Sequence, residues 1–201
     1  LTIAGSDSGG GAGIQADLKT ISACGCYGMS AITAITAQNT IGVTDIHPVP
    51  VETLEKQIRA VIEDIGTGAI KIGMLHSVEV IECVVHVLSD YETGSIVLDP
   101  VMVATSGDQL IQDDAVEAMK QLLFPLVNCI TPNIPEAQIL LDSKINGEQG
   151  LKDAAAKLGK RFNISVLAKG GHLEQETLTD IFYDHSQDSL TTISSKKIET
   201  E

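Results

Sequence analysis

Short apolar runs alternate with helical patterns along most of the chain, and this alternation limits the possible folds more than any other feature of the sequence. The apolar runs, rich in isoleucine and valine, span residues 1–5, 30–36, 69–74, 95–102, 128–133 and 164–171. Between them, apolar side chains recur at the helical period over residues 51–65, 78–88 and 151–162. This repeat predicts an α/β fold with a mostly parallel sheet and helices on both faces.

The sequence also predicts features at the ends of these elements. Ser77 is a candidate N-cap for the helix that follows it, and Asp114 with Glu117 resembles a capping pair. Residues 176–198 differ from the rest of the chain, because their apolar residues alternate and predict two strands around the sequence YDHSQDS.

Composition and charge restrict the class of protein. With 201 residues and 43% hydrophobic side chains, the chain can form one sizeable core, and we expect a single domain over residues 1–201. The net charge of −14 argues against nucleic acid and an anionic membrane surface as main partners, since both select basic patches. The apolar stretch MSAITAITA is far too short to span a membrane.

The four cysteines favour a reducing, cytoplasmic location. Their spacing makes neither a disulfide framework nor a Cys-x-x-Cys metal site. Cys24 and Cys26 fall at a predicted helix end, where we expect small buried apolar side chains. No charged segment followed by an apolar one opens the chain, so we expect no export signal.

The sequence GSDSGGGAGIQAD, residues 5–17, is rich in glycine just before a predicted helix. The dinucleotide-binding pattern Gly-x-Gly-x-x-Gly is absent from it, and no glycine in the chain is followed by lysine and a hydroxyl residue, as a P-loop requires. Two interpretations remain. The stretch is either a flexible turn between strand and helix, or a surface that lets a ligand approach the backbone closely.

Polar residues and glycines follow every predicted strand of the parallel sheet. Gln38 follows the second strand, Met74 and His76 the third, and Asp99 with TSGD the fourth. TPNIPEA follows the fifth strand, and Lys169 with two glycines ends the sixth. Ligands of open α/β sheets bind beyond the carboxyl ends of the strands, so these residues predict a site along one edge.

The segments at this edge resemble one known family. The chain is similar to hydroxymethylpyrimidine/phosphomethylpyrimidine kinase of thiamine biosynthesis, in the ribokinase-like superfamily, through IAGSDSGGGAGIQADLKT, TAQNT, KIGML, VLDPVM, SGD, TPNIPEA and KGGH in this order. The resemblance runs from Leu1 to about Glu174. It implies a three-layer α/β/α fold and a small-molecule substrate. ATP would phosphorylate 4-amino-5-hydroxymethyl-2-methylpyrimidine, and then its monophosphate to the diphosphate.

The resemblance also implies which residues bind the pyrimidine. The glycine stretch, with Gly5 and Gly11, forms a floor for the ring, and Gln38 recognises it, since a carboxamide offers both a donor and an acceptor. Asp17 is carried over as a carboxylate of the substrate pocket, although it could be an exposed acid in a first helical turn. Met74 packs against the ring or is an ordinary core methionine.

A second group of residues is implied for phosphoryl transfer. Lys169 is expected to contact the nucleotide phosphates and to act in catalysis, with Asp99 helping the metal or the phosphates. Asn133 and Glu136 match an Asn-x-x-Glu element that supports Mg²⁺, usually through water, and Asn133 is also assigned to the nucleotide. Without the family, the same two residues are simply a helix cap and its partner. His172 is expected to be structural.

The chain departs from the family pattern at its C-terminal end. Family members continue into a Gly-Thr-Gly-Cys loop that opens a helix and forms an anion hole, and we expect the present chain to be truncated before it. The family also suggests a homodimer. Two alternative functions stay open: a pyridoxal or pyridoxine kinase of the same superfamily, and a non-catalytic pyrimidine-binding protein.

Overall fold

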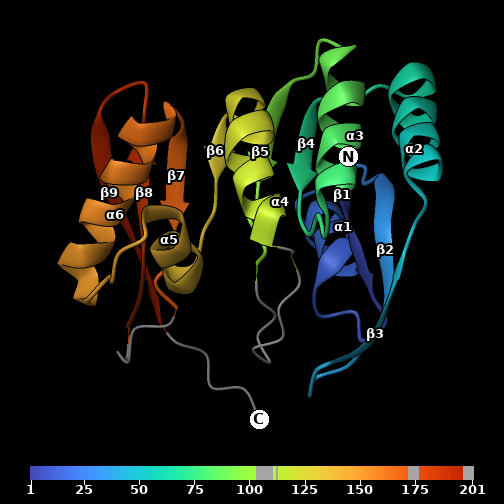
Figure 1. The fold of residues 1–201 in the computed structure, drawn as a ribbon. Helices are drawn as coiled ribbons and strands as arrows, with labels where there is room; N and C mark the ends of the chain where they lie inside the picture. Colours follow the sequence, from blue (N-terminus) through green and yellow to red (C-terminus); the bar gives the residue numbers. More distant parts are fainter. Residues whose placement is uncertain (103–110, 112, 172–176, 197–201) are drawn as a thin grey trace. The chain divides into compact units, whose positions relative to one another are not determined.

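The computed structural model describes residues 1–102, 111, 113–171 and 177–196, and the chain divides into two compact units (Figure 1). Unit 1 spans Leu1–Leu126 and unit 2 spans Val127–Glu201. The alternation of strands and helices is confirmed in both units. The expectation of a single domain is not tested by this division and stays a prediction.

Unit 1 contains a sheet with the strand order β3-β2-β1-β4-β5. The strands are β1 (Thr2–Asp7), β2 (Ser30–Gln38), β3 (Val43–Pro48), β4 (Ala69–Ile72) and β5 (Ser95–Leu98). β1 pairs in parallel with β2 and β4, and β4 pairs in parallel with β5. The predicted parallel sheet is therefore confirmed. β3 pairs antiparallel with β2 and was not predicted, because its short, mostly exposed run carries no clear alternation.

Helices cover both faces of the unit 1 sheet, as expected (Figure 1). α1 (Gly13–Ala23) lies on one face, and α2 (Val51–Asp64) and α3 (Val78–Ser89) lie on the other. This arrangement follows from right-handed crossovers, because the chain moves from β1 to β2 in one direction and from β3 through β4 to β5 in the other. Ser77 caps α3 as predicted, accepting a hydrogen bond from the Val80 amide at 3.4 Å.

The core of unit 1 consists of aliphatic side chains from the sheet and from α2 and α3. Its members are almost completely buried and include Ile3, Ile70, Ile72, Leu98, Leu54, Ile58, Ile81 and Val84.

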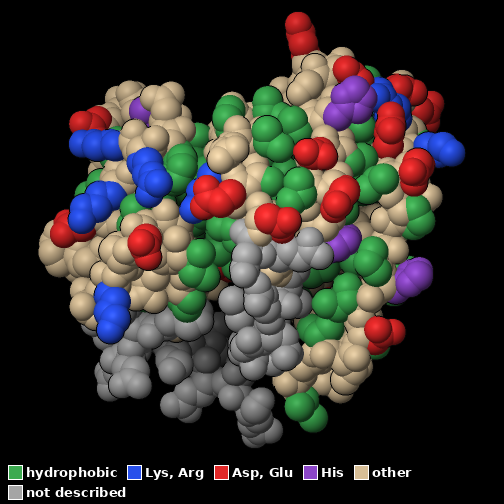
Figure 2. All heavy atoms as spheres, in the orientation of Figure 1, with side chains coloured by type: hydrophobic (Ala, Val, Ile, Leu, Met, Phe, Trp, Pro, Cys, Tyr) green, Lys and Arg blue, Asp and Glu red, His purple; other side chains and the backbone are tan. Residues whose placement is uncertain are grey.

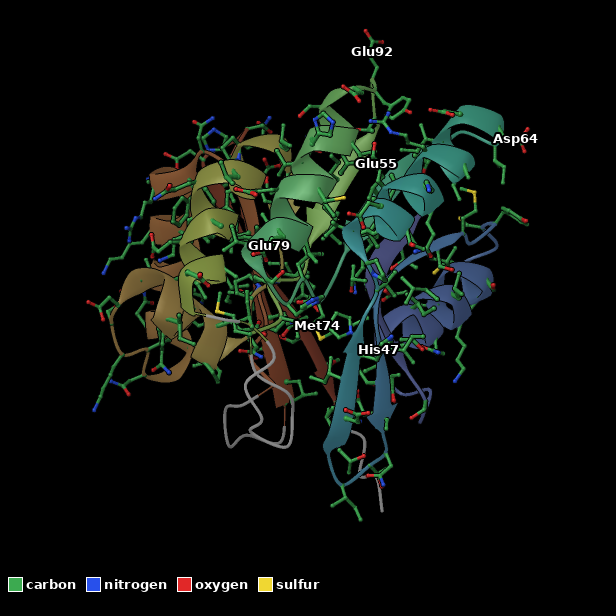
Figure 3. All side chains as sticks on the ribbon, turned by 45° about the vertical axis from the view of Figure 1, so that its right-hand side comes forward. His47, Glu55, Asp64, Met74, Glu79 and Glu92 are labelled. Carbon is green, nitrogen blue, oxygen red and sulfur yellow. The ribbon has the colours of Figure 1, made fainter. Side chains whose placement is uncertain are left out.

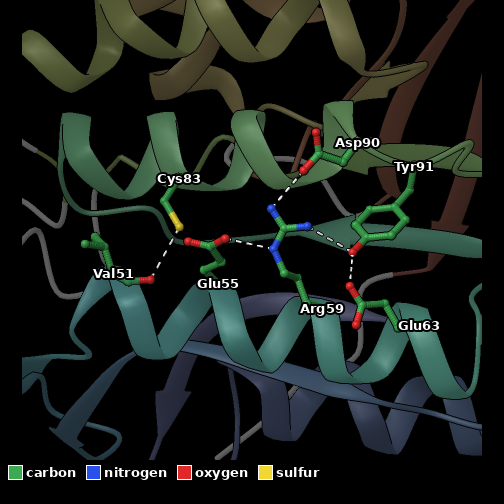
Figure 4. Close-up of polar contacts among 7 residues, drawn as sticks. All are labelled: Val51, Glu55, Arg59, Glu63, Cys83, Asp90 and Tyr91. Carbon is green, nitrogen blue, oxygen red and sulfur yellow. Dashed lines mark hydrogen bonds and ion pairs between the residues drawn. The ribbon is translucent and has the colours of Figure 1, made fainter.

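A polar link joins α2 to the end of α3 at the outer edge of this core. Arg59 of α2 forms hydrogen bonds with Glu55 on the same helix and with Asp90 and Tyr91, which follow α3 (Figure 4). The bonds to Asp90 and Glu55 raise the pKa of Arg59, so the guanidinium that links the two helices is fully charged.

The chain after β5 forms the last helices of unit 1. They are α4 (Asp113–Ala118), the π-helical turn η1 (Met119–Leu123) and the 3₁₀ turn η2 (Phe124–Leu126). The prediction that Asp114 begins this helix as a cap was wrong, because α4 already includes Asp113 and places Asp114 inside the first turn, exposed to solvent.

Unit 2 contains the strand order β6-β7-β8-β9. Its elements are β6 (Cys129–Ile130), α5 (Ile134–Leu141), α6 (Gly147–Phe162), β7 (Ser165–Ala168), β8 (Thr177–Asp184) and β9 (Ser189–Lys196). β6 and β7 are parallel, whereas β7, β8 and β9 pair antiparallel, which confirms the predicted C-terminal hairpin. α6 packs on β7 and β8, with Gly159 directly against the Tyr183 ring.

The structure bears on three expectations, which concern charge, membrane spans and cysteines. Figure 2 shows Asp and Glu side chains spread over α2 and α3. In the part of the chain that the structure describes, no helix is both long and apolar enough to cross a membrane. The expected burial of Cys24 and Cys26 was wrong: α1 ends at Ala23, Gly25 has a left-handed φ of +76°, and both cysteines are exposed.

Candidate active site

A pocket of about 240 Å³ opens at the carboxyl end of β1 in unit 1. β1, the glycine stretch, α1, β2 and the segments after β4 and β5 all contribute to its walls. Gly5, Asp17, Gln38, Met74 and Asp99, which were predicted as site residues from five separate segments, all line it. The structure thus brings these residues together. Their individual roles remain predictions.

Asp7 organises the glycine stretch. Its buried carboxylate accepts hydrogen bonds from the backbone amides of Gly9 (2.8 Å), Gly11 (2.9 Å) and Ala12 (2.7 Å). Carboxylates that accept several amide bonds hold a loop firmly, because each bond is charge-assisted. The stretch is therefore an ordered turn around one carboxylate, and Gly11 belongs to this turn rather than to the pocket lining that the structure describes.

Two glycines let the backbone pass closely at the pocket floor. A Cβ at Gly5 would lie 2.7 Å from the Met74 Cε, so this glycine leaves room for the methionine. Gly13 has φ +54°, and a Cβ there would overlap the carbonyl oxygen of Gly5. Glycine is required at Gly13 by both its conformation and the neighbouring strand.

Asp17 lies on α1 with its carboxylate directed at the sheet. Its Oδ2 accepts a hydrogen bond from the Thr2 hydroxyl at 2.6 Å, and its Oδ1 lies 3.0 Å from the Lys71 Nζ. The Asp17 side chain is only 16% exposed. It lies beyond the first turn of α1, so the alternative of an exposed acid in a first helical turn was wrong.

Gln38 ends β2 at the rim of the pocket. Its backbone amide and carbonyl both bond the Ser8 hydroxyl, at 2.8 and 2.6 Å, which ties β2 to the glycine stretch. The Thr36 hydroxyl lies 3.2 Å from the Gln38 Oε1 and is itself bonded to the Ser6 carbonyl. The contact with the Ser6 carbonyl is the shorter one, so the single Thr36 proton goes to β1, and the Gln38 carboxamide forms part of the pocket wall.

Met74 and Asp99 complete the described wall. Met74, labelled in Figure 3, follows β4 and is 8% exposed, and the Thr33 hydroxyl bonds its carbonyl at 2.9 Å. It is thus nearly buried and still reaches the pocket. The Asp99 amide donates a hydrogen bond to the Ile72 carbonyl at 2.8 Å, which sets Asp99 beside the end of β4.

His76 follows Met74 by two positions. Burial lowers the pKa of His76, against the opposing effect of Glu79, so this imidazole is neutral near pH 7.

The remaining predicted residues lie together in unit 2. Asn133 and Glu136 form a capping box: the Asn133 Oδ1 accepts from the Glu136 amide at 2.9 Å, and the Glu136 Oε2 accepts from the Asn133 amide at 2.7 Å. Lys169 follows β7, and its amide bonds the Pro132 carbonyl at 2.8 Å, forming a bridge beside Asn133. The helix-cap interpretation of Asn133 and Glu136 is confirmed. These two residues follow β6 and Lys169 follows β7, so all three lie after the carboxyl ends of these strands.

The donors present suit a Mg²⁺ ion that arrives with a nucleotide. Among the described residues, no three His, Cys, Asp or Glu side chains gather as a metal site. Mg²⁺ is usually bound through one or two carboxylates, waters and substrate phosphates, so a full protein cage is not needed. Glu136 is 3% exposed, and its Oε2 accepts the hydrogen bond from the Asn133 amide. This position fits a contact with Mg²⁺ through water better than direct coordination.

Sequence reasoning placed Asp7 at this edge of the sheet without a role, and it missed Thr36 and Lys71 as parts of the site. Asp7 was the most accessible of them to prediction, because an aspartate followed by glycines is typical of a carboxylate-centred turn. Lys71 is 54 positions from Asp17, and no local pattern reports such a pair. His172 and the TSGD segment lie outside the described residues.

Comparisons with known proteins show the family of this chain. A family model described as phosphomethylpyrimidine kinase matches residues 7–201, nearly the whole chain. The chain belongs to the phosphomethylpyrimidine kinase family. It is therefore a member of a family of phosphotransferases, and one family model spans both of its units.

Individual relatives agree with this family. The hydroxymethylpyrimidine/phosphomethylpyrimidine kinase of Haemophilus influenzae is 54% identical over 172 residues, which is 86% of this chain and 64% of that protein. The crystal structure of phosphomethylpyrimidine kinase from Clostridium difficile 630 has a TM-score of 0.85 and 47% identity, covering 96% of this chain and 82% of that one. This chain thus spans less than two thirds of the Haemophilus relative.

A pyridoxal kinase is also similar. An ADP complex of Bacillus subtilis pyridoxal kinase has a TM-score of 0.88 and 34% identity, covering 100% of this chain and 76% of that one. These neighbours confirm the predicted fold class: a ribokinase-like three-layer α/β/α architecture with a mostly parallel sheet, here in a member of the phosphomethylpyrimidine kinase family.

Proposed function

We propose that the protein uses ATP to phosphorylate 4-amino-5-hydroxymethyl-2-methylpyrimidine, and then its monophosphate to the diphosphate, in thiamine biosynthesis. The observation that carries this proposal is the pocket at the end of β1, where Gln38, Asp17 and Met74 converge from three segments. The names of the relatives in the same family support the choice of substrate.

The chemistry of the pocket suits an aminopyrimidine. The ring carries an amino donor beside nitrogen acceptors, and the Gln38 carboxamide can pair with both kinds of group. Asp17 offers a carboxylate that can accept from the amino group. Met74 supplies a polarizable surface for the ring face, and the volume of about 240 Å³ fits a small molecule.

Phosphoryl transfer then requires positioning and charge neutralisation. The hydroxymethyl oxygen attacks the terminal phosphorus of ATP and its proton passes to water, while the bond from that phosphorus to the bridging oxygen breaks and ADP leaves with the electron pair. We assign Lys169 to the charge on the phosphoryl oxygens, Asn133 and Glu136 to the nucleotide and its metal, and Asp99 to the phosphates or the metal. A bound Mg²⁺ would supply further charge neutralisation. The ADP complex of the similar pyridoxal kinase supports an adenine nucleotide as donor.

A pyridoxal kinase activity is a second candidate. It is favoured by the similarity to Bacillus subtilis pyridoxal kinase over the full chain. Pyridoxal is also a small aromatic ring that bears a hydroxymethyl group, so the same pocket could orient it. Hydroxymethylpyrimidine and pyridoxal both present a hydroxymethyl group as the nucleophile. They differ in the polar groups on the ring edge that would face Gln38 and Asp17.

We further propose a single kinase domain, a homodimer and a cytoplasmic location. The family model that spans both units supports one domain. Ile35 on β2 is 52% exposed and Ile41 before β3 is 85% exposed, which favours a partner at this hairpin. The four cysteines are all free, in line with a reducing compartment.

A coupled assay of ADP release tests the proposed function. The full-length protein is given ATP and Mg²⁺ with hydroxymethylpyrimidine or with pyridoxal in parallel. We expect turnover with hydroxymethylpyrimidine, and a higher kcat/KM for it than for pyridoxal. A higher kcat/KM for pyridoxal would favour the second candidate, and no turnover with either would point to a binding protein.

Gln38→Ala is expected to weaken binding of hydroxymethylpyrimidine by about 1–3 kcal/mol, because a buried hydrogen-bonding edge of the ring loses its partner. Isothermal calorimetry measures this affinity directly. Gln187→Ala, at an exposed turn of unit 2, makes the same change outside the pocket and should leave the affinity unchanged. Equal affinities of the two variants would refute the assignment of Gln38.

A further inference from the structure

Lys71 is the one basic side chain among the described residues that line the pocket, and no role has so far been assigned to it. It lies in the middle of β4 and pairs in register with Thr2 on β1. Neighbouring residues of a parallel ladder project to the same face, so Lys71 and Thr2 both face α1. The two side chains meet at Asp17.

The geometry around Asp17 holds its carboxylate in one orientation. The Lys71 Nζ lies 3.0 Å from Oδ1 and 3.1 Å from Oδ2, so the ammonium spans both oxygens. Thr2 donates to Oδ2 at 2.6 Å. Oδ2 therefore has two partners, and Oδ1 has Lys71 as its partner within the described part of the chain. Both side chains are partly buried, with 31% of Lys71 and 16% of Asp17 exposed, so the pair is less screened than a surface ion pair.

The strand beside the pair leaves space for the ammonium. A Cβ at Gly73 would lie 3.0 Å from the Lys71 Nζ and 2.9 Å from the Ala4 Cβ. Any larger residue at this position would push against the ammonium or against β1. Gly73 thus allows Lys71 to bend over the sheet toward α1.

We propose that Lys71 is a positioning residue for substrate recognition, which fixes the Asp17 carboxylate so that it accepts a hydrogen bond from the exocyclic amine of the pyrimidine. The proposal rests on the proposed function. The pocket also contains the carboxylates of Asp7 and Asp99. Asp7 accepts from three backbone amides. The Lys71 ammonium lies within 3.1 Å of both Asp17 oxygens, so Lys71 is the countercharge for Asp17. Because Lys71 and Asp17 neutralise each other, the pocket can bind an uncharged aminopyrimidine without leaving an unpaired charge buried beneath it.

The test combines ligand affinity with a double-mutant cycle in the full-length protein. Lys71→Met keeps the unbranched chain up to the ε position and removes the charged amine, and Asp17→Asn replaces the carboxylate with a neutral carboxamide. We expect Lys71→Met to weaken hydroxymethylpyrimidine binding by about tenfold, the scale of one charge-assisted hydrogen bond. Its kcat at saturating substrate should change by less than about threefold, since Lys71 is assigned no contact with the transferred phosphoryl group.

Three controls separate positioning from a general structural role. In the Asp17→Asn background, Lys71→Met should add less than about a twofold further loss, because Lys71 acts through the carboxylate. Lys71→Arg, which keeps the charge, should recover most of the affinity. Lys56→Met makes the same substitution at an exposed position of α2 and should bind like the wild type.

The possible outcomes are distinguishable. Independent losses for Lys71→Met and Asp17→Asn, or an affinity of Lys71→Met equal to that of the wild type, would overturn the role of Lys71 and leave the proposed function standing. A wild-type protein that does not bind hydroxymethylpyrimidine would overturn the proposed function, and this inference with it.

Discussion

Lys169→Ala is expected to lower the rate constant of phosphoryl transfer by about 10²–10³-fold, comparable to the loss of one oxyanion-hole donor. Lys169 follows β7 at the carboxyl edge, where its backbone is held by the Pro132 carbonyl, and that bond survives the substitution. The charge is needed most when negative charge spreads over the transferred phosphoryl group, so kcat should fall far more than stability.

Rapid-quench measurement of a single turnover with the full-length protein gives this rate constant. Lys157→Ala is the matched control, because Lys157 is an exposed lysine of α6 in the same unit. It should keep the wild-type rate. Full turnover by Lys169→Ala, together with an unchanged melting temperature, would show that Lys169 does not take part in the chemistry.

Gly13→Ala should reduce the free energy of unfolding by about 3 kcal/mol, the sum of left-handed strain and overpacking. Gly13 has φ +54°, and its Cβ would overlap the Gly5 carbonyl oxygen, so β1 or α1 must shift. The same shift moves the pocket floor, and we expect weaker pyrimidine binding as well. Urea denaturation followed by circular dichroism measures the free energy of unfolding.

Gly25→Ala separates the two causes. Gly25 has φ +76° with nothing within 4 Å of its Cβ position, so alanine there adds conformational strain without a steric overlap. It should cost only about 1 kcal/mol and leave ligand affinity unchanged. Equal losses for the two variants would mean that the contact between Gly13 and β1 does not constrain the pocket.

The fold was largely predictable because its strongest signals are local. Buried parallel strands appear as continuous apolar runs, and α2 and α3 show the helical period directly. Predictions failed where neighbours in space override local pattern. β3 is an exposed edge strand that forms a strand because it pairs with β2. Cys24 is exposed because α1 ends at Ala23, one residue before it.

The site was predictable as a set of strand ends, but its internal contacts were not. Gln38, Met74 and Asp99 follow strands, so the rule for open sheets brings them to one edge. The bond from Lys71 to Asp17 joins β4 to α1, and the hydroxyl of Thr2 reaches Asp17 from β1. Such contacts depend on the register of strands and the rotation of a helix, which no short pattern in one sequence specifies.

Phosphorus NMR of the reaction products tests the central claim most directly. The full-length protein is incubated with ATP, Mg²⁺ and hydroxymethylpyrimidine, and the spectra are followed over time. We predict that a pyrimidine monophosphate signal rises first, and that signals of the diphosphate then replace it as ADP accumulates. ADP formation without any phosphorus signal attached to the pyrimidine would contradict the account.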